Sequence, residues 1–289
     1  MKKFTVFTIV LGALVVASMV SCTKKDGVYN PKKKIQRIYC SSTDTEKYMD
    51  QSWDWNDNLL GAINHYYTSG GLYWTENFSY EKNRLTRVDD YINSEYATYE
   101  YDGSKLKSIN YYFKTNLEAS ASYAYTDGKL SKITMTMYDA KSAGERHLKA
   151  SLLPFPKEVT KVVNKCLESM PVNATKEMST YTLELTWTGK NVTKLIVTED
   201  GNIRTVALQY DNKINVTKGF YDLYTFENFG DYYFSENNVT SMVSTSSDGD
   251  NLVLNYTYQY DSDNWPTARV QKYVVDEVDW QQIDYFEYK

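Results

Sequence analysis

The sequence predicts an all-β protein, an antiparallel meander of repeated hairpins. Its composition favours strands, with 28 Tyr, 10 Phe and 6 Trp against 13 Gly and 5 Pro. A short motif, aromatic-Asp-Gly-x-Lys-Leu-x-x-Ile, recurs along almost the whole chain, and its flanks alternate between apolar and polar residues. We expect about 16 strands in a long twisted sheet that curls on itself, with edge strands at its two ends and one inserted helix. A flat single layer is the alternative.

The clearest copy of the motif spans residues 99–109. Its Asp102-Gly103 pair accepts positive φ at little cost, as a tight turn between antiparallel strands requires. Before the turn, Tyr99 and Tyr101 share one face of a strand while Glu100 points to the other face. The copy therefore predicts a hairpin with one apolar and one wet face.

The same pattern recurs along the chain. Strong copies span 53–63, 78–88, 123–133 (with the turn Asp127-Gly128) and 185–195, weaker ones lie at 210–214, 234–242 and 258–266, and a half copy lies at 29–35. Most are spaced by roughly 21 to 26 residues, as in repeat architectures. The long gap between Tyr125 and Trp187 predicts an insertion. We divide the chain into a signal peptide (1–21), a tether (22–34), hairpin repeats (35–138), the insertion (139–178) and further repeats (179–289), all within one continuous domain.

The insertion contains an amphipathic pattern over residues 156–170, with apolar residues at helical spacing. Pro156 suits the first turn of a helix and Pro171 ends it. We expect this helix to cover the sheet rather than act as a lid or to bind a partner.

The N-terminus reads as a secretory signal, with a basic start and an apolar run that is too short for a membrane span. It ends in Met19-Val20-Ser21-Cys22, which resembles the bacterial lipobox, although Met19 replaces the usual Leu. Diacylation of Cys22 would anchor the mature chain at the outer membrane. The alternative is an ordinary cleaved signal with an incidental cysteine.

The remaining cysteines are Cys40 and Cys166, which could form a disulfide or remain as two buried thiols. The two histidines, His65 and His147, stand in no catalytic or metal-binding motif, so we expect neither an enzyme nor a cofactor. The acidic turns at 248–251 and 261–264 fit turn chemistry better than calcium binding.

Without Lys2 and Lys3 the mature chain has 30 basic and 37 acidic residues, a net charge of about −7, which argues against nucleic acid as a partner.

The repeat unit resembles the YD-type repeats of RHS-like proteins. Together with the lipobox and the Tyr-rich strands, it also resembles uncharacterised lipoproteins of Bacteroides and relatives. Such repeats imply a shell, stalk or scaffold, so we expect a non-enzymatic, membrane-anchored envelope lipoprotein that contacts protein or polysaccharide.

Two other functions remain open. A glycan-binding lipoprotein would need aromatic platforms, for which Trp53, Trp74, Trp265 and Trp280 are candidates, although a tryptophan on a strand is more often part of the core. A small outer-membrane β-barrel would also explain the many alternating strands, but the chain ends in Tyr288-Lys289 and an acyl anchor would be redundant, so we rank this function last.

Overall fold

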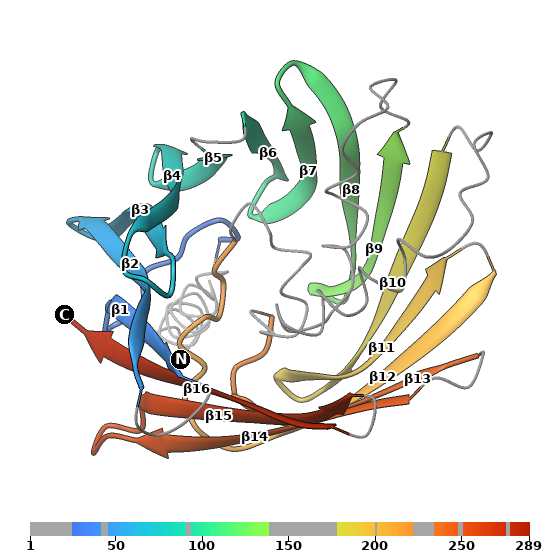
Figure 1. The fold of residues 1–289 in the computed structure, drawn as a ribbon. Coiled ribbons are helices and arrows are strands. Elements are labelled where there is room, and N and C mark those ends of the chain that lie inside the picture. Colours follow the sequence, from blue (N-terminus) through green and yellow to red (C-terminus); the bar gives the residue numbers. More distant parts are fainter. Residues whose placement is uncertain are drawn as a thin grey trace, which may run out of the picture.

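The structure is a computed structural model that describes residues 25–41, 46–90, 94–138, 178–199, 201–221, 234–247, 251–275 and 278–289. Sixteen antiparallel strands follow one another around a closed ring (Figure 1). Their bounds are β1 Ile35–Ser41, β2 Tyr48–Asn56, β3 Leu59–Tyr66, β4 Leu72–Glu81, β5 Arg84–Asp90, β6 Glu95–Asp102, β7 Lys105–Phe113, β8 Asn116–Thr126, β9 Lys129–Tyr138, β10 Met178–Thr188, β11 Asn191–Glu199, β12 Asn202–Tyr210, β13 Val239–Ser246, β14 Asn251–Tyr260, β15 Pro266–Val275 and β16 Val278–Tyr288.

The sheet has no edge, which corrects the prediction of an open, curled sheet. The first strand pairs with the last, from Ile35 opposite Tyr288 to Ser41 opposite Ile283, and on its other side β1 pairs with β2. Closure satisfies the backbone groups that edge strands would have left unpaired. The described residues also contain no helix, and the expected helix at 156–170 lies outside them.

The barrel has two different ends. At one, which we call the turn end, tight connections join β2 to β3, β4 to β5, β6 to β7, β8 to β9 and β10 to β11, and both β1 and β16 have an end there. At the other, which we call the loop end, β1 leads to β2, β3 to β4 and β9 to β10. The long connection 139–177 starts from the loop end, whereas the connection between β12 and β13 starts from the turn end.

The predicted glycine turns lie at the turn end. Asp127 (φ 51°) and Gly128 (φ 76°) are the two central residues of the β8–β9 turn, and both have positive φ. In the β6–β7 turn Asp102 still pairs with Lys105, so the central residues are Gly103 (φ 53°) and Ser104. That turn therefore lies one residue later than the motif suggested.

The inner wall of the barrel is apolar. One row of directly paired inner residues crosses five neighbouring strands, and all of its members are buried: Tyr99, Ile109, Ala121, Met135 and Tyr181. Alternation places the opposite set of side chains on the outer wall. The barrel thus has its hydrophobic core inside.

An aromatic residue of the motif ties most of the hairpins to the strand before them. Its side chain donates a hydrogen bond to a main-chain carbonyl on the preceding strand, just after the preceding turn. The seven bonds, between 2.5 and 2.9 Å long, are Trp55 to Ile35, Tyr101 to Leu85, Tyr125 to Leu106, Trp187 to Leu130, Tyr210 to Val192, Tyr258 to Val239 and Tyr288 to Pro266. These bonds connect strands that the tight turns do not join, so they form a belt near the turn end.

The motif's basic residue covers the same aromatic ring. Arg84 lies 3.6 Å above the ring centre of Tyr101, and Lys105 lies 5.1 Å from that of Tyr125. In each of these two pairs, the Arg or Lys places its cation near the aromatic ring of the next repeat. The leucine that follows it supplies the main-chain carbonyl to which that aromatic side chain donates its hydrogen bond.

Candidate functional site

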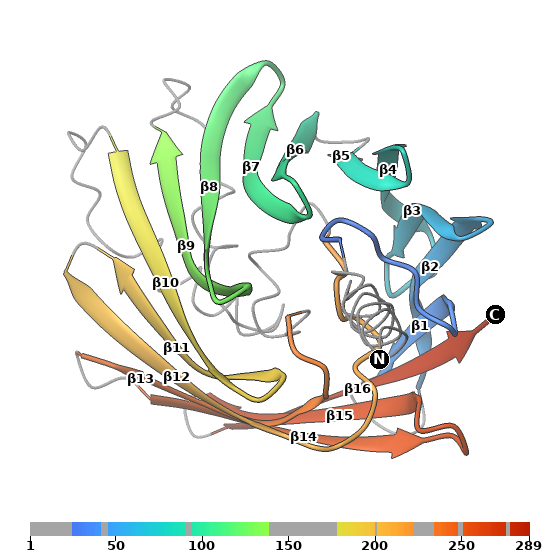
Figure 2. The ribbon, with the colours of Figure 1, turned by 180° about the vertical axis from the view of Figure 1, so that it is seen from behind.

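The N-terminal segment, residues 25–34, runs through the inside of the turn end (Figures 1 and 2). Asp26 lies at its start and is held by several hydrogen bonds. Its carboxylate accepts bonds from the Leu106 amide (2.9 Å) and the Tyr125 hydroxyl (3.0 Å), and its amide donates to the Ser104 carbonyl (2.9 Å). Arg84 donates to the Asp26 carbonyl at 2.9 Å. Far from being a loose tether, this segment is part of the fold.

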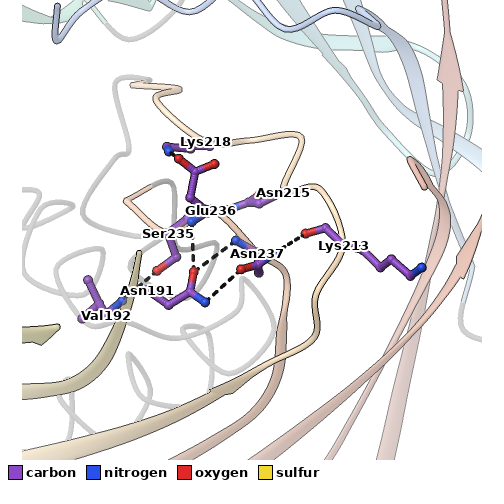
Figure 3. Close-up of polar contacts among 8 residues, drawn as sticks. All are labelled: Asn191, Val192, Lys213, Asn215, Lys218, Ser235, Glu236 and Asn237. Carbon is purple, nitrogen blue, oxygen red and sulfur yellow. Dashed lines mark hydrogen bonds and ion pairs between the residues drawn. The ribbon is translucent and has the colours of Figure 1, made fainter. Parts of the chain in front are cut away.

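A second internal segment, residues 211–221 with 234–238, lies beside it and docks on the β10–β11 turn (Figure 3). Asn191 is the main contact. Its side-chain oxygen accepts bonds from the amides of Glu236 (3.1 Å) and Asn237 (3.2 Å), and its side-chain nitrogen donates to Asn237 Oδ1 at 3.0 Å. Ser235 adds a bond from the Val192 amide at 3.1 Å.

The two internal segments meet in an aromatic cluster. The buried Tyr29 hydroxyl donates to the Val216 carbonyl at 2.9 Å, and its ring lies 5.3 Å from that of Phe220. Trp53 of the wall lies 5.0 Å from Phe220 and 6.4 Å from Trp55. These residues belong to one continuous hydrophobic core, so the barrel's own chain fills the turn end.

Polar and ionisable side chains replace apolar ones on the inner wall nearer the loop end. On β3 and β4, His65 Nε2 lies 3.2 Å from Glu76 Oε2, and the His65 ring stacks on Trp74 with centroids 3.8 Å apart. The Glu76 side chain is only 1% exposed, and across the β4–β5 ladder Glu76 pairs with the buried Asp90. This arrangement holds a carboxylate and an imidazole inside the wall.

A second polar group lies where the barrel closes. Asp284 of β16 accepts bonds from Arg269 Nε (2.9 Å), Gln282 Nε2 (2.8 Å) and the Cys40 thiol (3.1 Å). Burial raises the pKa of the Cys40 thiol well above its usual range, and the neighbouring Asp284 carboxylate adds to the shift. Cys40 is thus a protonated, hydrogen-bonded thiol rather than a nucleophile. Cys166 lies outside the described residues.

Chemically, these groups pair charges and hydrogen-bond one another inside the wall. Within the described part of the chain, no cluster of three or more His, Cys, Asp or Glu side chains is arranged to hold a metal ion. Sequence reasoning missed both groups, although His65, Glu76 and Asp90 occupy inward positions beyond the apolar part of their strands. The alternation of inward and outward positions along each strand could have identified these residues as inward-facing.

The tryptophans proposed as a glycan platform are mostly inside. Trp53 and Trp265 are 5% and 6% exposed, so neither presents a face to a sugar. Trp74 is half-buried against His65 on the inner wall, and the side chain of Trp280 lies outside the description. Cys22 also lies outside the described residues.

The acidic turn at 261–264 shows ordinary turn chemistry. Asp261 accepts bonds from the amides of Asp263 (2.9 Å) and Trp265 (3.0 Å), and its other oxygen is paired with Lys33 at 2.6 Å. Lys33 lowers the pKa of Asp261. Lys33 also pairs with Asp263 at 2.9 Å. Two ion pairs therefore hold the N-terminal segment against this turn.

On the neighbouring strands β6 to β11, one level of the outer wall is polar. A register row on six neighbouring strands consists of Glu100, Ser108, Ser122, Thr134, Thr182 and Thr198, each directly paired with the next. None of these residues is buried, whereas their neighbours Tyr99, Ile109 and Ile133 are buried inside. No helix among the described residues is long and apolar enough to cross a membrane.

Comparison with the first of two solved structures shows a shared fold. A porin-like protein from Bacteroides uniformis aligns with 88% of this chain and 98% of its own, at a TM-score of 0.53 and 13% identity. A porin-like protein from Bacteroides vulgatus aligns with 89% of this chain and 99% of its own, at a TM-score of 0.30 and 10% identity. No protein-family model and no curated protein matches the sequence. At 13% identity the first of these likenesses bears on the fold alone, and it agrees with the closed barrel described above.

Proposed function

We propose that this chain is a β-barrel of the outer membrane that is anchored by acyl chains on Cys22 and whose wall stands in water. In this role it is a non-enzymatic scaffold that contacts protein or polysaccharide. The observation that carries the proposal is the polarity of the outer row on strands β6 to β11. A membrane-spanning barrel needs an outward apolar band about 25 Å tall, but the outer row from Glu100 to Thr198 carries only carboxylate and hydroxyl side chains.

The interior supports the same conclusion. Porins conduct through a polar, water-filled lumen, whereas the turn end here is filled by the apolar cluster of Tyr29, Trp53 and Phe220. A pore would require that cluster to be displaced. The barrel is better suited to hold a fixed shape than to conduct.

Detergent phase separation tests the anchor. The full-length protein, produced in a bacterium that acylates lipoproteins, is compared with residues 23–289 exported behind an ordinary cleavable signal. We expect the first in the detergent phase and the second in the aqueous phase. If both enter the detergent phase, the wall itself is membrane-embedded and the proposal fails.

A second function, glycan or protein recognition, is favoured by an exposed apolar group at the loop end, formed by the β3–β4 connection and the start of β4. Tyr67, Leu72 and Tyr73 are 51%, 57% and 48% exposed, and the two tyrosine rings lie 4.6 Å apart. Exposed aromatic pairs of this kind can stack on sugars or pack into a partner. We expect the double variant Tyr67→Ser, Tyr73→Ser to lose binding on a glycan array or to a captured envelope protein, and the control Leu117→Ser on β8 to retain it. If the double variant binds as wild type does, recognition lies elsewhere.

A further inference from the structure

The described chain begins at the turn end. Lys25 is exposed and Asp26 is fixed by Ser104, Leu106, Arg84 and Tyr125. One residue later, the Gly27 carbonyl accepts a 2.9 Å bond from the Leu85 amide. The first described residues are therefore held by contacts to two tight turns.

We propose that the turn end faces the membrane and that its partner is the bilayer surface that receives the acyl chains of Cys22. This inference rests on the proposed acylation. Asp26 is the fourth residue after Cys22, and a chain spans at most about 3.5 Å per residue, so Cys22 lies within roughly 14 Å of Asp26. The strand β8 is 11 residues long, and at about 3.4 Å per residue and a tilt of roughly 40° the barrel wall there is about 28 Å tall, which is about twice this reach. The segment from Cys22 to Asp26 is therefore too short to let the loop end face the bilayer.

The charges of the turn end are compatible with lipid headgroups. Exposed lysines lie there at positions 25, 32, 82, 129, 190 and 289. Exposed acids lie there too, at Asp57, Glu81, Asp102 and Asp127, while Asp261 and Asp263 are already paired with Lys33. The surface is mixed in charge, so the lysines add only a short-range attraction to anionic headgroups that the tether brings close.

The orientation has a consequence for the other end. The exposed group Tyr67, Leu72 and Tyr73 belongs to the loop end. It would face away from the membrane, where a partner can reach it. The turn end would then bind the bilayer, and the loop end would be exposed to a partner.

Depth-dependent fluorescence quenching tests the orientation. A bimane label is placed at Lys129→Cys at the turn end or at Asn116→Cys at the loop end; both positions are exposed and lie at opposite ends of the β8 strand pair. The background carries Cys40→Ser and Cys166→Ser. Acylated protein is reconstituted into vesicles of phosphatidylcholine and phosphatidylglycerol with a headgroup nitroxide quencher.

We expect quenching several-fold stronger at position 129 than at 116. Equal quenching, stronger quenching at 116, or no quenching at either position of an acylated protein would each overturn the orientation. Mass spectrometry of the N-terminal peptide is done first. If the peptide carries no acyl chains, the proposed anchoring is wrong. If it carries them and the quenching contradicts the expectation, the anchoring stands and only the proposed orientation is wrong.

Discussion

The hydroxyl of Tyr101 donates a 2.7 Å hydrogen bond to the carbonyl of Leu85 on the neighbouring strand. The first residue is the aromatic anchor of one repeat, and the second is the leucine that follows the turn of the repeat before it. The same relationship joins Tyr125 to Leu106 and Trp187 to Leu130. The repeat consensus therefore encodes contacts between repeats as well as the hairpin within each one.

Removing this bond should destabilise the barrel. In Tyr101→Phe the carbonyl of the buried Leu85 loses its side-chain donor, and an unsatisfied buried group costs about 1–3 kcal/mol. Chemical denaturation measures the loss. Tyr112→Phe is the control, because its ring stacks on Tyr96 at 4.7 Å on the outer wall. Equal losses in the two variants would show that the bond to Leu85 contributes nothing specific.

A methyl group at Gly27 should dislodge the N-terminal segment. A Cβ built there would lie 2.0 Å from the Tyr101 hydroxyl, and φ at Gly27 is +75°. Gly70→Ala provides a matched control, since φ is +91° there but no atom lies within 4 Å of the added Cβ. We expect Gly27→Ala to lower the melting temperature more than Gly70→Ala and to expose residues 25–34 to protease. Equal effects would mean that only backbone strain matters.

The β6–β7 turn should tolerate asparagine but not valine. Gly103 has φ +53° and open space around its Cβ position, so any penalty comes from the backbone alone. A β-branched residue in this region costs roughly 1 kcal/mol or more, while Asn adopts it readily. Thermal unfolding of Gly103→Val, Gly103→Asn and wild type should give that order of stability. A valine variant as stable as wild type would contradict the turn assignment.

Alkaline pH should unfold the barrel cooperatively. Burial raises the pKa of Tyr29, Tyr123 and Tyr221 above the ordinary value of 10.0, because the phenolate is poorly solvated inside. The folded pKa is the higher one, so this contribution to stability is complete below pH 10.0 and is lost as the pH rises above it. Tyrosinate absorbance and circular dichroism should change together. Full tyrosine ionisation with an unchanged β-sheet spectrum would refute the assignment.

The same effect bears on membrane assays. Strongly alkaline extraction would itself unfold a barrel held by buried tyrosines, so release at high pH would not distinguish an anchored from an embedded wall. Phase separation at neutral pH avoids this problem.

The repeat and its turns could be read from local sequence. Alternation of residues such as Tyr99, Glu100 and Tyr101 reports which face is buried, and Asp127-Gly128 reports a turn that needs positive φ, because both depend only on neighbours along the chain. The inward tryptophans could not be placed in the same way. Trp53 occupies a strand position open to either a core or a platform role, and only its packing against Tyr29 and Phe220 decides between them.

By itself the sequence determined an antiparallel sheet of repeated hairpins, an apolar and a polar face, and a lipobox-like N-terminus. Only the tertiary structure decided that the sheet closes and that its apolar face points inward onto residues 25–34 and 211–221. Closure depends on pairing Ile35 with Tyr288, residues separated by almost the entire chain. No local pattern encodes such a contact, because its stability comes from strand edges that exist only once every other strand is in place.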